Sequence, residues 1–155
     1  MAHATPATRA LHASTAALRA LRDRVQQLRP ELHCDLGALR RESIRMALQQ
    51  AGDPPQLAEL AFEVFLAERQ RVDLFDDALP ALQYLSRRWP VVALSNGNAD
   101  VHQMGLGHYF HATVSAREAG VPKPDARIFH QAAMAAGVGP DQVLHIGDDA
   151  HLDTQ

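Results

Sequence analysis

Three short apolar runs in the second half of the chain most constrain its fold. They read "VVALSN" at residues 91–96, "ATVSA" at 112–116 and "VLHIGD" at 143–148. Each has the length and valine-rich composition of a buried strand, and segments with helical spacing separate them. Strands that alternate with helices form βαβ units, so the pattern predicts an α/β fold with a parallel sheet.

The first half of the chain has a helical period instead. Apolar residues recur every three or four positions, and Pro30 and Gly52 mark two helix ends. Helices are predicted at residues 16–29, 36–50, 56–70, 78–87, 99–104 and 124–136. The predicted organisation is a loose N-terminal segment at 1–15, a helical region at 16–72 and an α/β region at 73–155.

Composition excludes several classes of protein. The chain has 155 residues, 46% of them apolar, and a net charge of −3, which argues against binding to nucleic acid or to a membrane surface. No apolar run approaches the ~20 residues of a membrane helix. A single cysteine, Cys34, excludes an internal disulfide and fits a reducing compartment. We expect a cytoplasmic protein, and an arginine-bearing transit peptide at residues 1–22 is the alternative.

Polar groups follow the first two predicted strands. Ser95 and Asn96 end the first one, and Gly97 allows the backbone to approach a ligand closely. Lys123, the only lysine among the 15 basic residues, lies between two prolines after the second strand. Ligands of open α/β sheets bind beyond the carboxyl ends of strands. A hydroxyl, an amide and an ammonium there predict a phosphate site, although each group alone is more often part of a turn or an exposed loop.

Carboxylates follow the third predicted strand, in "GDDAHLD". The candidate metal ligands are Asp148, Asp149 and Asp153. Hard carboxylate oxygens suit Mg²⁺, which usually takes one or two protein carboxylates together with phosphate and water. The three groups of polar residues together predict a phosphate bound between a cation and Mg²⁺.

The order "VVALSNGN", "KPDARIF" and "VLHIGDDAHLD" resembles the second, third and fourth motifs of the haloacid dehalogenase-like (HAD) hydrolase superfamily. The helical region at 16–72 resembles the all-helical cap of that superfamily. The resemblance covers about residues 16–155. It implies a HAD-like Rossmannoid parallel sheet with an all-helical cap.

The resemblance also implies roles for the site residues. Ser95 would hydrogen-bond the transferring phosphoryl group, with Asn96 beside it, and Lys123 would neutralise charge on the nucleophile and the phosphate. Asp148 would be the main ligand of Mg²⁺. Asp149 and Asp153 would support it directly or through water.

The superfamily contains both phosphatases and dehalogenases. The dehalogenases need no metal, and their fourth motif carries serine and asparagine. This chain has Asp148 and Asp149 there instead. A cluster of carboxylates would repel a carboxylate substrate unless a cation intervened. We therefore predict Mg²⁺-dependent hydrolysis of a small phosphorylated metabolite. The closest resemblance is to phosphatases of FMN and of a phosphorylated riboflavin precursor.

One part of the family pattern is missing. The first motif of the family is a strand that ends in Asp-x-Asp-x-Thr and supplies the nucleophile. The aspartates of residues 1–72 are Asp23, Asp35 and Asp53, and none has a second aspartate two positions later. The resemblance implies that this strand lies between those of the second and fourth motifs. We therefore expect an incomplete core, without its first and last strands, and an inactive chain.

Three alternative functions and two alternative sites stay open at this point. The chain could be a non-catalytic remnant that binds or scaffolds, a metal-independent 2-haloacid dehalogenase, or a receiver-like or nucleotide-binding module. The nine histidines could bind a metal, but their spacing does not favour it. Arg87 and Arg88 could contact a substrate phosphate, although a solvated helix end is the simpler interpretation.

Overall fold

The computed structural model describes residues 14–153 and divides the chain into two compact units, with the boundary between Arg69 and Gln70. Most of the predicted loose segment 1–15 lies outside the described residues. Ser14 and Thr15 are the exceptions, because Ser14 caps the first described helix and Thr15 begins it.

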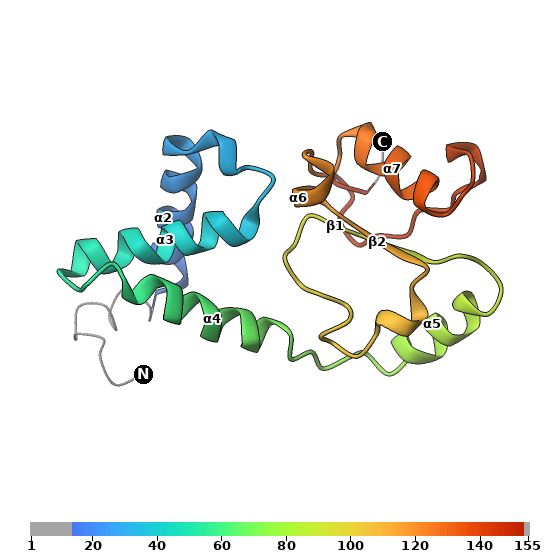
Figure 1. Ribbon diagram of the computed structural model, residues 1–155, viewed down its shortest axis with the longest axis horizontal. Coiled ribbons are helices and arrows are strands. Elements are labelled where there is room, and N and C mark those ends of the chain that lie inside the picture. The colour runs from blue at the N-terminus through green and yellow to red at the C-terminus, as the bar shows by residue number, and fades with distance from the viewer. Residues whose placement is uncertain (1–13, 154–155) are drawn as a thin grey trace. The chain divides into compact units, whose positions relative to one another are not determined.

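The first unit consists of helices (Figure 1). Its elements are α2 (Thr15–Leu28), the 3-10 turn η1 (Pro30–Leu32), α3 (Leu36–Ala51) and α4 (Leu57–Arg69). The side chains of Ser14 and Asp35 accept backbone hydrogen bonds at the starts of α2 and α3, and Gly52 ends α3 with a φ of 74°. The three helices predicted in this region are confirmed.

The core of the helical unit lies along α3, which packs against both α2 and α4. Leu21 and Val25 of α2 are buried, and so is Leu39 of α3. A buried cluster joins α3 to α4 through Ile44, Leu48, Ala58 and Phe62. The apolar period read from the sequence therefore corresponds to the faces that the three helices bury.

The second unit contains a two-stranded parallel sheet. Strand β1 (Val92–Ser95) pairs with β2 (Ala112–Ser115), with Val92 opposite Ala112 and Ser95 opposite Ser115. The predicted strands at 91–96 and 112–116 and their parallel pairing are thus confirmed. The other elements are α5 (Ala78–Ser86), η2 (Gly107–Tyr109), α6 (Ala116–Ala119), α7 (Ala126–Ala135) and η3 (Pro140–Gln142).

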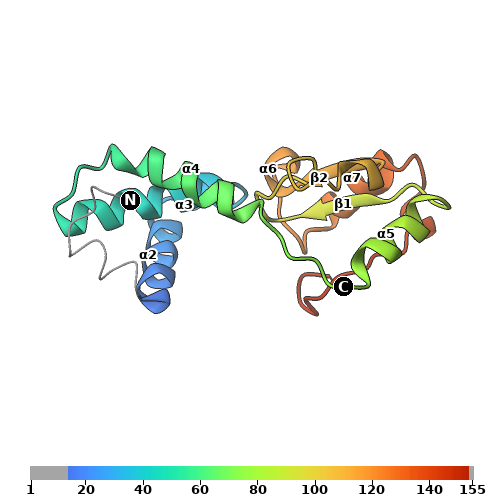
Figure 2. The same ribbon diagram turned by 90° about the horizontal axis from the view of Figure 1, so that it is seen from below.

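Helix α7 covers one side of the strand pair, and α5 lies on the other side (Figures 1 and 2). The buried cluster of this unit joins β2, α6 and α7 through Val114, Ala116, Val121 and Ile128, with Val92 and Leu94 of β1 packed against it. Helix α5 has no buried residue. Only one side of the sheet therefore has a packed core within the described residues.

Two predictions for this unit were wrong. Residues 99–104 form turns rather than a helix, and Asp100 accepts a hydrogen bond from the His102 backbone N–H at 2.8 Å. Aspartate readily makes such local turns, which compete with a helix. The third predicted strand, 143–148, is not a strand. Leu144 and Ile146 are 84% and 73% exposed, because no strand among residues 14–153 pairs with this segment.

Candidate active site

The candidate site lies where β1 ends. Ser95 is the last residue of β1 and is exposed, and its Oγ accepts a hydrogen bond from the Gly97 backbone N–H at 2.8 Å. This bond closes a tight turn directly after the strand. A hydroxyl has one hydrogen to donate and two lone pairs, so the Ser95 hydroxyl can still donate to an anion.

Asn96 holds Lys123 in place. The Asn96 side-chain Nδ2 donates to the Lys123 carbonyl oxygen at 3.1 Å, and the Lys123 backbone N–H donates to Asn96 Oδ1 at 2.7 Å. Because each backbone group has a fixed donor or acceptor role, the two bonds also fix the orientation of the amide. The end of β1 is thereby tied to the segment that carries the lysine, although 27 positions separate the two residues.

The ammonium of Lys123 meets a buried carboxylate. Lys123 Nζ lies 2.5 Å from Asp153 Oδ1, and His145 Nε2 lies 2.9 Å from the same oxygen. The Asp153 side chain is 4% exposed and that of Lys123 is 13% exposed. The structure thus brings together two of the predicted residues, from the second and third groups, and adds His145.

Several hydrogen bonds stabilise Asp153 in its charged form. The His145 ring, the Lys123 ammonium and the Asp149 backbone N–H all bond its carboxylate, and together they hold the pKa of Asp153 well below its usual range. The carboxylate and the ammonium are therefore a charged pair at neutral pH. This pair fixes the end of the Lys123 side chain beside Asp153.

Gly147 makes room for this arrangement. A Cβ built on Gly147 would collide with the Cγ, Oδ2 and Cβ atoms of Asp153. A short aspartate side chain that is already held by three bonds cannot move aside easily. The Asp153 side chain therefore occupies the space that the glycine leaves.

The two adjacent aspartates have different surroundings. Asp149 Oδ1 accepts hydrogen bonds from the backbone N–H groups of His151 and Leu152 at 2.9 and 3.0 Å, so Asp149 closes the loop. Asp148 is exposed, and its carboxylate makes no hydrogen bond to another residue within 14–153. Of the three aspartates predicted to bind a metal, Asp148 is therefore the one with open oxygens.

The donor set fits Mg²⁺ only in a limited form. No group of three or more histidine, cysteine, aspartate or glutamate side chains among the described residues is arranged to hold a metal ion. Asp153 is paired with Lys123, and Asp149 bonds the loop backbone. Mg²⁺ often takes only one or two protein carboxylates and completes its shell with phosphate and water. Asp148 fits that requirement.

Sequence reasoning missed His145. This residue lies between Leu144 and Ile146, and its ring meets Phe129 edge to face at 5.0 Å between centroids. The available signal was a polar residue inside an apolar run, because successive side chains of an extended segment point to opposite sides. No sequence pattern indicated the two Asn96–Lys123 bonds, since they join distant parts of the chain.

Comparison with known proteins identifies the family of this chain. The family model described as haloacid dehalogenase-like hydrolase matches residues 3–155. A 5-amino-6-(5-phospho-D-ribitylamino)uracil phosphatase, YigB of Escherichia coli (strain K12), is 34% identical over 140 residues, which are 88% of this chain and 59% of that protein. A phosphoserine phosphatase of Thermus thermophilus is 34% identical over 125 residues, 77% of this chain and 50% of that protein.

A solved structure agrees with the fold. The crystal structure of a 2-haloacid dehalogenase from Pseudomonas syringae has a TM-score of 0.80 and 33% identity, covering 95% of this chain and 70% of that chain. The chain spans between half and three fifths of the two curated phosphatases that it matches. On the match of the family model to nearly its whole length, this chain belongs to the haloacid dehalogenase-like hydrolases.

Proposed function

We propose that this chain is the cap and most of the catalytic core of a Mg²⁺-dependent phosphatase acting on small phosphate monoesters in the cytoplasm. The observation that carries the proposal is the link from Asn96 through Lys123 to Asp153, which holds an ammonium beyond the end of β1 with the open carboxylate of Asp148 in the same segment as Asp153. The phosphatases among the relatives support the same chemistry.

In this proposal a carboxylate oxygen attacks phosphorus, the alcohol of the ester leaves, and water then hydrolyses the aspartyl-phosphate. The Ser95 hydroxyl donates to a phosphoryl oxygen. The Lys123 ammonium stabilises the charge that develops between the attacking carboxylate and the phosphate. Asn96 and Asp153 act on the lysine, since they fix its backbone and its side chain.

Asp148 would hold Mg²⁺ in this site, together with oxygens of the phosphate and of water. The ion supplies neutralisation of the phosphate charge when it is bound. Asp149 and Asp153 support the loop on which Asp148 lies, because their carboxylates bond backbone N–H groups at residues 149, 151 and 152. The 155 residues contain no Asp-x-Asp sequence, so the attacking carboxylate is not assigned to any of them.

The test compares two proteins. The 155-residue chain, free of host phosphatase, should release no significant phosphate from p-nitrophenyl phosphate with Mg²⁺, since loss of a nucleophile removes on the order of 10⁶-fold in rate from a well-studied hydrolase. A version extended with a strand ending in Asp-x-Asp-x-Thr and with further C-terminal elements should be active. Turnover by the chain alone would show that the nucleophile lies among residues 1–155.

The metal is tested in the extended version. Asp148→Asn should raise the Mg²⁺ concentration needed for half activity more than Asp149→Asn or Asp153→Asn, because only the Asp148 carboxylate is open. Asparagine keeps the size and removes the charge. An Asp148→Asn protein with unchanged Mg²⁺ dependence would contradict the metal assignment.

Dehalogenation is the second candidate, because the solved neighbour at a TM-score of 0.80 is a 2-haloacid dehalogenase. The extended version is therefore also assayed with 2-chloropropionate in EDTA. Chloride release without metal, and no phosphate release with Mg²⁺, would favour the dehalogenase. A third outcome, no activity in either assay from a folded extended version, would favour a non-catalytic protein that binds or scaffolds.

A further inference from the structure

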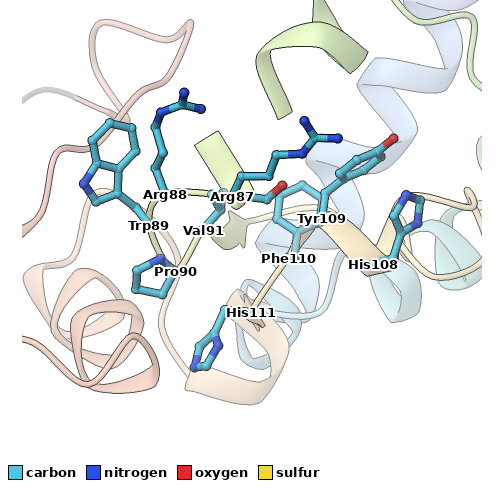
Figure 3. A pocket seen from close by; sticks show the side chains of 10 residues that line it. Arg87, Arg88, Trp89, Pro90, Val91, His108, Tyr109, Phe110 and His111 are labelled. Carbon is cyan, nitrogen blue, oxygen red and sulfur yellow. The ribbon is translucent and has the colours of Figure 1, made fainter. Parts of the chain in front are cut away.

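A hollow of about 470 Å³ opens at the amino ends of the two strands (Figure 3). One wall is the segment 86–91, which joins α5 to β1, and the other is the segment 108–111, which leads into β2. The His111 backbone N–H donates to the Val91 carbonyl oxygen at 2.7 Å and ties the walls together. Because the strands are parallel, this hollow lies at their amino ends and the candidate active site lies at their carboxyl ends.

The hollow is lined by basic groups without acidic ones. Its ten lining residues, all within the described part of the chain, include Arg87, Arg88, His108 and His111 but no aspartate or glutamate. Arg88 is held, since its guanidinium lies 3.7 Å from the centre of the Tyr84 ring and donates to the Tyr84 carbonyl oxygen at 2.9 Å. A positive lining of this kind favours an anionic ligand.

Arg87 differs from its neighbour. It is exposed, and its guanidinium makes no hydrogen bond to another side chain or carbonyl within residues 14–153. In Figure 3 its side chain extends toward Tyr109, whereas Trp89 and Arg88 lie together on the other side. A guanidinium with all its donors available can bind two oxygens of one phosphate at once. The held Arg88 then supplies a second, already ordered cation.

Aromatic rings complete the lining. Trp89 is 56% exposed, and its ring centre lies 6.3 Å from that of Tyr84. Tyr109 packs on His108 at 3.9 Å between ring centres, and its hydroxyl accepts a hydrogen bond from Gln83 Nε2 at 3.3 Å. Exposed aromatic faces bind planar bases by stacking, with little preference for one base over another. The volume lies in the range of sites for a single small molecule.

We propose that this hollow is a second binding site, for an organic phosphate that carries an aromatic ring, of the kind a mononucleotide presents. Arg87 takes the phosphate, Arg88 adds a second positive charge to the lining, and Trp89 or Tyr109 stacks on the ring. The proposal does not depend on the phosphatase chemistry, because none of its residues belongs to the candidate active site. The proposal gives a binding role to Arg87 and Arg88, for which the simpler interpretation of the sequence was a solvated helix end.

The chain offers a direct reporter, since Trp89 is its only tryptophan. The full chain is titrated in EDTA with adenosine monophosphate, adenosine or inorganic phosphate, and the tryptophan fluorescence is followed. The expected result is saturable quenching by the monophosphate, with weaker binding of both adenosine and phosphate. Equal affinity for adenosine and its monophosphate would overturn the proposal, because the phosphate would then contribute nothing.

Matched variants locate the ligand. Arg87→Gln should weaken binding about tenfold or more, the usual cost of losing a charge-assisted hydrogen bond. Arg127→Gln removes the same charge from the start of α7, where the guanidinium pairs with Asp125, and should leave affinity unchanged. Lys123→Ala should also leave it unchanged. An equal loss in Arg87→Gln and Arg127→Gln, or a loss in Lys123→Ala, would overturn the assignment to this hollow.

Discussion

The helical unit and the α/β unit bury their apolar side chains to different extents. Both units have apolar side chains that are at most 2% exposed, which are Val25, Leu39, Ala47 and Ala58 in the helical unit and Ala116, Ile128 and Ala133 in the α/β unit. Exposed large apolar side chains occur in both units, but those more than three quarters exposed, among the described residues, all lie in the α/β unit. They are Phe75, Met134 and Leu144.

The difference follows from how helices and strands pair the hydrogen-bonding groups of their backbones. A helix bonds its own backbone groups, so three amphipathic helices need only each other to form a core. A strand bonds its neighbours, and within residues 14–153 β1 pairs only with β2. The segment 143–147 therefore has strand-like composition without strand structure. A further strand beside β1 would complete the packing of the α/β unit.

The largest expected effect is on stability, and it is tested by replacing one leucine of each unit with alanine. Leu39→Ala should destabilise the helical unit by about 2–5 kcal/mol, because Leu39 is 2% exposed and its loss leaves a cavity. Leu144→Ala should change stability by less than about 0.5 kcal/mol, because Leu144 is 84% exposed. Urea unfolding followed by circular dichroism measures both.

The same two substitutions test the contrast between the units again in the extended version. If a further strand covers residues 143–147 there, Leu144→Ala should become costly while the cost of Leu39→Ala stays the same. An equal cost for the two substitutions in the 155-residue chain would refute the contrast between the units.

A second prediction concerns rate. In the extended version, Lys123→Ala should lower kcat by about 10²–10³-fold, the usual loss on removal of one group that stabilises transition-state charge. Arg127→Ala, which also removes a cation from the α/β unit, should leave kcat near the parent value, because the Arg127 side chain is 71% exposed and its pair with Asp125 lies at the surface. Steady-state kinetics with p-nitrophenyl phosphate distinguish the two, and an unchanged rate in Lys123→Ala would remove the lysine from the mechanism.

A third prediction compares two glycines. Gly52→Ala places a side chain at a φ of 74° with no atom within 4 Å of its Cβ, so it should cost about 1–2 kcal/mol of stability through the backbone alone. Gly147→Ala collides with Asp153 and should disturb the Lys123–Asp153 pair instead. In the extended version, we expect a lower kcat for Gly147→Ala and an unchanged kcat for Gly52→Ala. The reverse pattern of rates would contradict the role of Gly147.

The smallest expected effect is on pH dependence. Because the pKa of Asp153 is lowered in the folded chain by His145 and Lys123, its charged form stabilises the fold above the ordinary carboxyl pKa of about 3.9. That stabilisation is lost as the pH falls below this value. The stability difference between the parent and Asp153→Asn should therefore be constant above about pH 5 and shrink in acid. A difference that grew as the pH fell would contradict the direction of the shift.

Much of the secondary structure could be predicted from local signals. Asp35 and Gly52 bound α3, and Asp125 caps α7 through a bond to the Arg127 backbone N–H. The predictions failed where local signals compete, as with Asp100, whose side chain bonds the backbone two residues on. They also failed at 143–148, because a strand needs a neighbour that periodicity in its own residues cannot reveal.

Motifs, caps and periods are local, so the sequence alone predicts the family, the parallel pairing of the first two runs and the polar residues after each run. The contacts among those residues are seen only in the tertiary structure. It joins Asn96 to the Lys123 backbone, pairs Lys123 with Asp153, brings in His145 and leaves Asp148 open. These contacts depend on how loops at one sheet edge fold onto each other, and hydrogen bonds between residues 27 to 30 positions apart leave no period in the sequence.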